Sequence, residues 1–229
     1  FQRYNASGTA VGGETRANTA IVGQAGAAQY EPGIVQLSTG DLLVAWRSDG
    51  QDGSNSGVYA QRFSSAGAAI GTEFQLNTYT SDYQYDPQLT PTATGFVVAW
   101  TSRGQDGSAD GIYARLYDNH GDPTSAEFRV NESSYYYQWE PAVTTLANGG
   151  FAIAWRGYNA NTGDWDTYAQ QFDAAGNRVD GETRVDGPTT GEQQPALVGL
   201  NNGNFVVSWF GYSDASDAGI FQRVVGNPA

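Results

Sequence analysis

The chain lacks cysteine, methionine and lysine, and His120 is its only histidine. Without cysteine it has neither a disulfide framework nor a thiolate nucleophile or metal ligand. Without lysine it cannot form a Schiff base, and with one histidine it has little material for a His-rich zinc site or a Ser-His-Asp triad. We assign no catalytic residue from the sequence.

Positive charge is also scarce. Eleven basic residues, all arginine, face 24 acidic ones, so the net charge is −13. Nucleic acids and anionic membranes reward positive charge, so neither is an expected partner. Solubility in a salty exterior explains the same charge. No apolar run approaches the roughly 18 residues of a membrane span, so we expect no membrane insertion.

An internal repeat organises what is present. The tryptophans Trp46, Trp100, Trp155 and Trp209 are spaced 54, 55 and 54 residues apart. Each ends an apolar run rich in β-branched residues, and a Gly/Asp/Ser cluster and a second strand-like run follow. Glycine is abundant (30), aromatic residues make up 13%, and no segment has a sustained helical period. The pattern predicts an all-β repeat protein.

Each repeat reads as four antiparallel strands, A to D, with the tryptophan on strand B. Four-stranded units of about this length are typical of propeller blades. We therefore predict one four-bladed β-propeller domain over 1–229, because two sandwiches would not explain the period. Its units are 30–77, 85–131, 139–186, and a blade from 1–18 plus 195–229 whose terminal strands close the ring. Because the sequence starts at Phe1, we expect a piece of a longer protein.

The repeat also resembles a known family. An apolar run ending in Trp, then GQDGS, then Gly-Val/Ile-Tyr-Ala, is found at Trp46–Arg62 and Trp100–Arg115. This pattern is similar to the tandem repeats of large secreted RTX-type bacterial adhesins and exoproteins. The third and fourth units depart from it, with TGDWD and SDASD in place of GQDGS. The resemblance implies an extracellular, calcium-associated adhesive or structural module without an activity of its own.

The loops between strands B and C are candidate Ca²⁺ sites, because they combine hard oxygen ligands with glycines that let backbone carbonyls turn inward. The alternative is that Asp, Ser and Gly are ordinary turn formers here, and the spacing does not match an EF-hand. The candidate metal ligands are Asp49, Asp52, Asp106, Asp110, Asp164 and Asp166.

The linkers that enter strand A end in a shared motif, with an acidic residue before a proline in three repeats. Because strand A lines the channel of a propeller, Glu31, Asp86 and Glu140 should approach one axis. Carboxylate pairs at a channel mouth are the machinery of glycosidases. A structural role shared by each blade is the simpler interpretation, since the positions are equivalent.

Two of these linkers are rich in aromatic residues and the other two carry none in the corresponding stretch. Aromatic side chains offer flat apolar area with a polar edge, which suits sugar rings or a protein surface. Packing between blades is the alternative. The candidate ligand-binding residues are Tyr79, Tyr83, Tyr85, Tyr135, Tyr136, Tyr137, Trp139, Tyr158 and Trp165.

Taken together, the sequence favours a non-enzymatic extracellular module that binds carbohydrate or a cell-surface protein through its long-looped face. One alternative is a carbohydrate-active enzyme, a glycosidase or lyase, that uses the channel carboxylates. Another is a structural or self-assembling filament subunit, a homo-oligomer joined through its terminal strands.

Overall fold

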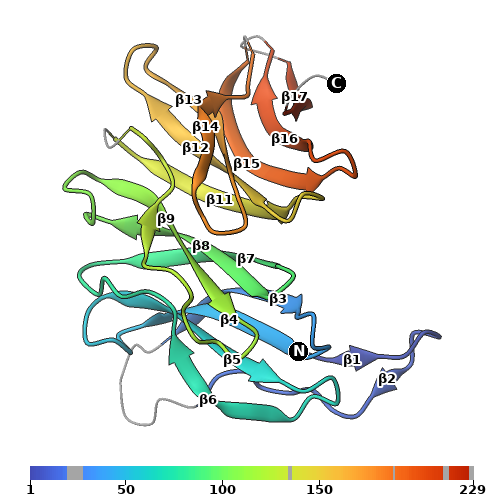
Figure 1. Cartoon of the computed structure of the whole chain (residues 1–229). Helices are drawn as coiled ribbons and strands as arrows, with labels where there is room; N and C mark the ends of the chain where they lie inside the picture. The colour runs from blue at the N-terminus through green and yellow to red at the C-terminus, as the bar shows by residue number, and fades with distance from the viewer. Residues whose placement is uncertain (20–27, 134–135, 188, 214–216, 227–229) are drawn as a thin grey trace.

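A computed structural model describes residues 1–19, 28–133, 136–187, 189–213 and 217–226. These residues form strands and turns and no helix, as predicted, so among them no helix is long and apolar enough to cross a membrane. The strands assemble into antiparallel sheets that stack along an arc, as in a propeller (Figure 1).

Four of the sheets are blades. Blade 1 consists of β3 (Gln29–Gln36), β4 (Leu42–Asp49), β5 (Ser56–Phe63) and β6 (Ala69–Gln75). Blade 2 consists of β7 (Gln84–Pro91), β8 (Gly95–Arg103), β9 (Asp110–Asp118) and β10 (Phe128–Arg129). Blade 3 consists of β11 (Gln138–Thr145), β12 (Phe151–Asn159), β13 (Asp164–Phe172) and β14 (Arg178–Arg184). Blade 4 has three strands, β15 (Thr190–Gly199), β16 (Phe205–Tyr212) and β17 (Ala218–Val225), and the remaining sheet pairs β1 (Arg3–Tyr4) with β2 (Ala10–Val11).

The four repeated tryptophans lie between blades. All are at most 4% exposed, and each packs against the preceding unit. Trp100, for example, contacts a cluster that includes Leu37 and Leu76 of blade 1. Trp46 has the same role against Phe1 and Ala17, which precede blade 1. Apolar burial between sheets therefore holds the stack together.

Strand A of each blade is the innermost, and β3, β7, β11 and β15 contact one another in sequence. Each contains a β-bulge next to its proline, and the residue before that proline has a left-handed backbone. The φ angles are 55° at Glu31, 57° at Asp86, 55° at Glu140 and 50° at Gln194. Non-glycine residues seldom adopt this conformation, and a bulge redirects the side chain that it carries. The four equivalent side chains are therefore held in an unusual direction at the inner edge.

The ring does not close, which corrects the prediction of a closed four-bladed propeller. Among the described residues, β1 and β2 pair only with each other, and β17 pairs only with β16. Figure 1 shows β1 and β17 at opposite ends of the arc. The reason lies in packing: Phe1 and Ala17 fill the face of blade 1 beside Trp46, so the N-terminal strands continue the stack instead of completing blade 4.

Candidate functional site

The bulges bring three carboxylates to the inner edge of neighbouring blades. Oε2 of Glu31 accepts a 2.6 Å hydrogen bond from the backbone N–H of Asp86, the equivalent residue of blade 2. Oε2 of Glu140 accepts a 2.7 Å bond from the backbone N–H of Gln194, the equivalent residue of blade 4. Glu31 and Glu140 thus each tie one inner strand to the next, which is the structural role expected of a repeated position.

Asp86 breaks this pattern. Among the described residues its carboxylate accepts one side-chain hydrogen bond, of 3.3 Å, from Nε2 of Gln88. Burial, with smaller contributions from the charges of Glu31 and Glu140, raises the pKa of Asp86 to about 6, although the hydrogen bond from Gln88 lowers it in part. The inner edge therefore holds a carboxyl group that keeps its proton to unusually high pH, between two other carboxylates.

The neighbouring strand B explains why Asp86 differs. Arg47, on β4, places its guanidinium 3.8 Å from Glu31, and Arg156, on β12, lies 3.9 Å from Glu140. The residue at this place on β8 is Thr101, which is buried and carries no charge. Asp86 thus lacks the arginine that its two equivalents have. Blade 4 has Phe210 there, opposite Gln193, and Gln194 in place of the acid.

Aromatic side chains surround the two arginines. The Arg47 guanidinium lies over the rings of Tyr30, Tyr83 and Tyr85, 5.4 to 6.0 Å from their centroids. The Arg156 guanidinium lies 3.9 Å from the centroid of Trp165. Such contacts orient the arginines beside the carboxylates.

A continuous chain of ring contacts extends outward from Trp165. It stacks on Trp139 at 4.7 Å, and Tyr158 and Tyr137 contact this pair at 5.5 and 5.1 Å. Tyr136 contacts Tyr158 at 5.5 Å. We call these five residues the aromatic cluster. Its outer members Tyr136 and Tyr137 are 46% and 40% exposed, whereas Trp139, Tyr158 and Trp165 are half-buried.

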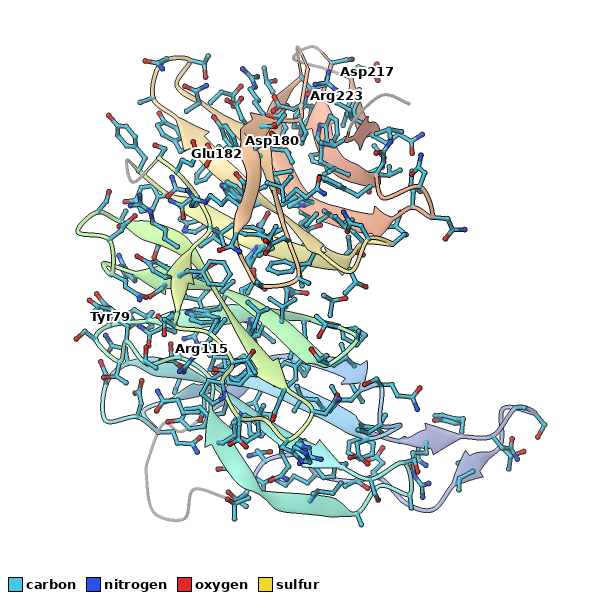
Figure 2. All side chains as sticks on the ribbon, viewed as in Figure 1. Tyr79, Arg115, Asp180, Glu182, Asp217 and Arg223 are labelled. Carbon is cyan, nitrogen blue, oxygen red and sulfur yellow. The ribbon has the colours of Figure 1, made fainter. Side chains whose placement is uncertain are left out.

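The other aromatic residues singled out from the sequence lie elsewhere. Tyr83 and Tyr85 are half-buried under Arg47, and burial raises the pKa of the Tyr85 hydroxyl, as does Asp110 nearby. Tyr79 lies at the left edge of the molecule, in the linker between β6 and β7 (Figure 2). Tyr135 lies outside the described residues.

The aspartates of each acidic loop do not cluster with one another as the ligands of one metal ion would. Asp49 pairs with Arg47 at 2.9 Å, and Asp52 and Asp106 each accept a bond from a loop backbone N–H. Asp110 accepts a 2.9 Å bond from the indole of Trp139. Asp164 accepts bonds from the backbone of Trp165 and Gly191. Asp166 alone of the six belongs to a group of three acidic side chains with adjacent oxygens, and its partners are Asp186 and Glu192.

Sequence reasoning missed Asp186 and Glu192. Asp186 follows β14 and Glu192 lies in β15, so the repeat pattern places them on opposite sides of a blade interface. The signal that could have found them is a comparison of repeats: equivalent positions hold Asn77 and Asn131 for Asp186, and Gln84 and Gln138 for Glu192. Only the third interface replaces both amides with acids.

One pocket lies away from the inner edge. It has a volume of about 560 Å³ and lies between β14 and β17, with Asp180 and Arg223 in its lining (Figure 2). Asp180 is the only carboxylate of that lining. The pocket therefore does not offer the two carboxylates that acid–base chemistry on a glycosidic bond needs.

No protein-family model matches the sequence, and no curated protein matches it. Solved structures do resemble the fold. A protein of unknown function from Dyadobacter fermentans matches 85% of the chain with a TM-score of 0.63 and 11% identity, and the chain spans 65% of that protein. An endo-arabinase from Bacteroides thetaiotaomicron matches 92% of the chain, which spans 78% of that enzyme, with a TM-score of 0.55 and 11% identity.

A third similar structure is an α-L-arabinofuranosidase from Fusarium graminearum. It matches 86% of the chain with a TM-score of 0.59 and 13% identity, and the chain spans 57% of that enzyme. At such identities the likeness establishes a β-propeller-like fold.

These comparisons correct the leading functional prediction from the sequence. We expected a non-enzymatic binding or adhesion module, but enzymes that act on carbohydrates recur among the similar structures, including a family-43 glycoside hydrolase. They favour the alternative, a carbohydrate-active enzyme. The sequence analysis treated the axial carboxylates as equivalent because their repeat positions are equivalent, whereas their surroundings differ.

Proposed function

We propose that the chain hydrolyses glycosidic bonds of a polysaccharide at the inner edge of blades 1 to 3. The observation that carries the proposal is Asp86, a carboxyl group with a raised pKa placed between Glu31 and Glu140. Glycoside hydrolysis needs a protonated acid and an ionised carboxylate on either side of the scissile bond. Because the surroundings of Asp86 differ from those of Glu31 and Glu140, Asp86 supplies the protonated acid and one of the other two supplies the ionised carboxylate.

In this proposal Asp86 is the general acid and transfers its proton to the glycosidic oxygen as the bond breaks. Glu31 or Glu140 acts as the second carboxylate, either taking a proton from water or attacking the anomeric carbon. Arg47 and Arg156 each lie within 4 Å of one of these two groups and hold a positive charge beside it. The similar structures include an endo-arabinase and an endo-1,4-β-xylanase, so arabinan and xylan are the first substrates to test.

The aromatic cluster borders Arg156 and Glu140 and offers stacking surfaces for sugar rings close to this site. It would position the polysaccharide chain and leave the chemistry to the carboxylates. A secreted location, which the resemblance to RTX-type exoproteins implies, would bring such an enzyme to its polymer.

The test is release of reducing ends from arabinan, xylan and other plant or bacterial polysaccharides. We expect Asp86→Asn to lower kcat by about 10²-fold or more, the usual contribution of a general acid. Asp122→Asn, which removes an exposed carboxylate far from the inner edge, is the matched control and should keep full activity. Activity that survives in Asp86→Asn, or no activity on any of these polymers, would contradict the proposal.

A further inference from the structure

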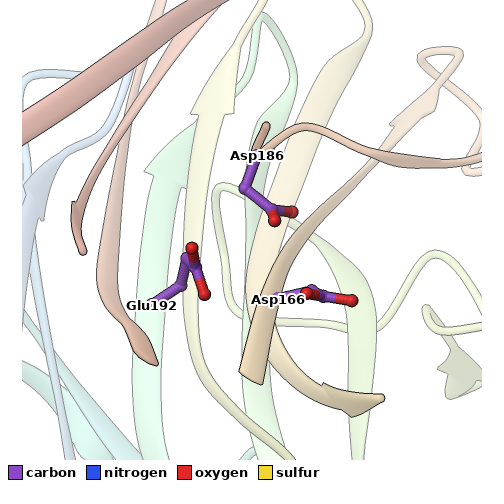
Figure 3. Close-up of side chains that lie close together, drawn as sticks. All are labelled: Asp166, Asp186 and Glu192. Atoms are coloured by element: carbon purple, nitrogen blue, oxygen red, sulfur yellow. The ribbon is translucent and has the colours of Figure 1, made fainter. Parts of the chain in front are cut away.

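The interface between blades 3 and 4 buries three carboxylates in one place. Asp166 on β13, Asp186 after β14 and Glu192 on β15 each contribute an oxygen, and the three oxygens lie within 4.8 Å of one another. The three residues are at most 5% exposed. Figure 3 shows the three side chains close to one another. Like charges brought so close and away from water repel strongly unless something neutralises them.

The other interfaces have uncharged side chains at the positions of Asp186 and Glu192. There an asparagine after the outermost strand donates from its amide to the glutamine that begins the next inner strand. The distances are 2.8 Å for Asn18–Gln29, 3.1 Å for Asn77–Gln84 and 3.2 Å for Asn131–Gln138. In the interface between blades 3 and 4 both amides have become carboxylates, and two ionised carboxylates have no hydrogen to share.

The third acid comes from a different position in blade 3 than in the other complete blades. Glycine stands at the position of Asp166 in the other complete blades, as Gly57 and Gly111. A Cβ atom at Gly57 would lie 2.9 Å from a carboxylate oxygen of Asp52, so the loop aspartate already fills that corner in blade 1. In blade 3 the acid comes from the strand itself, and its carboxylate joins the other two. Three separate replacements therefore converge on one point.

Protein groups neutralise only part of this charge. Arg184 pairs with Asp186 at 2.7 Å and with Asp166 at 2.9 Å, and the hydroxyl of Tyr168 and the amide of Asn159 donate to Asp166. One arginine against three carboxylates leaves a net charge of −2. Arg156 and Asp164, which also interact electrostatically with Glu192, carry opposite charges.

Glu192 shows where the missing partner belongs. Its side chain is 0% exposed, and neither carboxylate oxygen has a hydrogen-bonding partner of good geometry among the described residues. Gly211 replaces the serine found at Ser48 and Ser102, and a Cβ atom there would lie 3.5 Å from Oε1 of Glu192. Blade 4 therefore lacks a serine hydroxyl that could donate a hydrogen bond to Glu192.

We propose that Asp166, Asp186 and Glu192 form a structural site for one divalent cation, Ca²⁺, which joins blade 3 to blade 4. The ligands are all carboxylate oxygens, the donors that hard cations prefer, and a charge of +2 matches the unneutralised −2. The site lies in an interface, so bound Ca²⁺ stabilises the packed pair of blades. Its ligands differ from those expected within a single acidic loop.

The test compares wild type with a variant that restores the amide pair of the other interfaces, Asp186→Asn with Glu192→Gln. After removal of metal by a chelator, adding millimolar Ca²⁺ should raise the Tm of the wild type by several degrees and should leave the variant unchanged. Tb³⁺, a luminescent substitute for Ca²⁺, should give a saturable tryptophan-sensitised signal in the wild type, because Trp209 lies against Gly211 beside Glu192.

Two further variants keep the result interpretable. Glu14→Gln with Asp122→Asn removes the same number of negative charges at exposed positions, and it should retain the Ca²⁺ response. Glu192→Gln alone serves if the double variant does not fold, and it should weaken Tb³⁺ binding at least 10-fold. A wild-type Tm that does not change when Ca²⁺ is added would overturn the proposal. It would indicate instead that Asp186 and Glu192 share a proton. Equal Ca²⁺ responses in the wild type and the amide variant would overturn it as well.

Discussion

Oε2 of Glu31 lies 2.6 Å from the backbone nitrogen of Asp86, the residue at the same place in the next blade. The bond makes one carboxylate a structural link and places the next one beside it. Asp86 is then half-buried next to a negative charge, with Thr101 where its equivalents have an arginine. The hydrogen bond that links one blade to the next thereby leaves the carboxyl group of Asp86 in surroundings unlike those of Glu31 and Glu140.

Asp86 should make stability depend on pH. Its pKa is about 6 in the folded protein against 3.8 for an ordinary aspartate, so the folded state holds a proton that the unfolded chain releases. The free energy of unfolding therefore falls as pH rises from about 4 to about 6, and the loss persists above that range. Asp86→Asn avoids the loss and should be more stable than wild type at pH 8, by on the order of 1 to 3 kcal/mol.

Urea unfolding at pH 3.5 and pH 8 measures this difference. At pH 3.5 both proteins carry a neutral side chain at position 86, so their stabilities should be nearly equal. A stability difference that does not change between the two pH values would show that Asp86 titrates normally.

The charge of Glu31 should contribute to the high pKa of Asp86. Glu31→Gln removes that charge while its amide oxygen can still accept the bond from the backbone N–H of Asp86. Blade 4 carries an amide, Gln194, at the same position, so the fold tolerates it. The pKa of Asp86, followed by carboxyl-carbon NMR, should fall in Glu31→Gln and fall less in Glu140→Gln, because Glu31 has the larger effect. Equal pKa values in all three proteins would mean that burial alone raises it.

The repeated tryptophans should dominate stability. Trp100 is fully buried between blades 1 and 2, and replacing a large buried aromatic residue by alanine leaves a cavity. Trp100→Ala should lower the free energy of unfolding by about 3 to 5 kcal/mol, measured by chemical denaturation. A loss below about 1 kcal/mol would show that the interface can collapse around the cavity.

The aromatic cluster should separate binding from stability. Tyr136 is 46% exposed, so Tyr136→Ala should change the Tm little and should raise KM for a polysaccharide substrate. Trp165 stacks on Trp139 and on the guanidinium of Arg156, so Trp165→Ala should lower the Tm as well. Calorimetry and steady-state kinetics on the same preparations test both. A large Tm loss in Tyr136→Ala would place that ring in the core instead.

The periodic pattern of the sequence determined the local architecture. Four apolar runs ending in tryptophan at a spacing of 54 or 55 residues specify the strands and the residues buried between them, because strand formation and burial follow from neighbouring residues. Positions that share a place in the repeat, such as Glu31, Asp86 and Glu140, also share a backbone conformation. Their arrival at one inner edge could be predicted for that reason.

Only the tertiary structure decided what the repeat leaves open. Phe1 and Ala17 pack beside Trp46 and extend the arc. The sequence does not determine this packing, because the same apolar surface could equally have packed inside a closed ring. The raised pKa of Asp86 depends on burial and on charges from two other blades. Asp166, Asp186 and Glu192 are separate along the chain and come together only where blade 4 packs on blade 3. Electrostatic energies depend on distances across the interfaces, and a sequence pattern does not contain those distances.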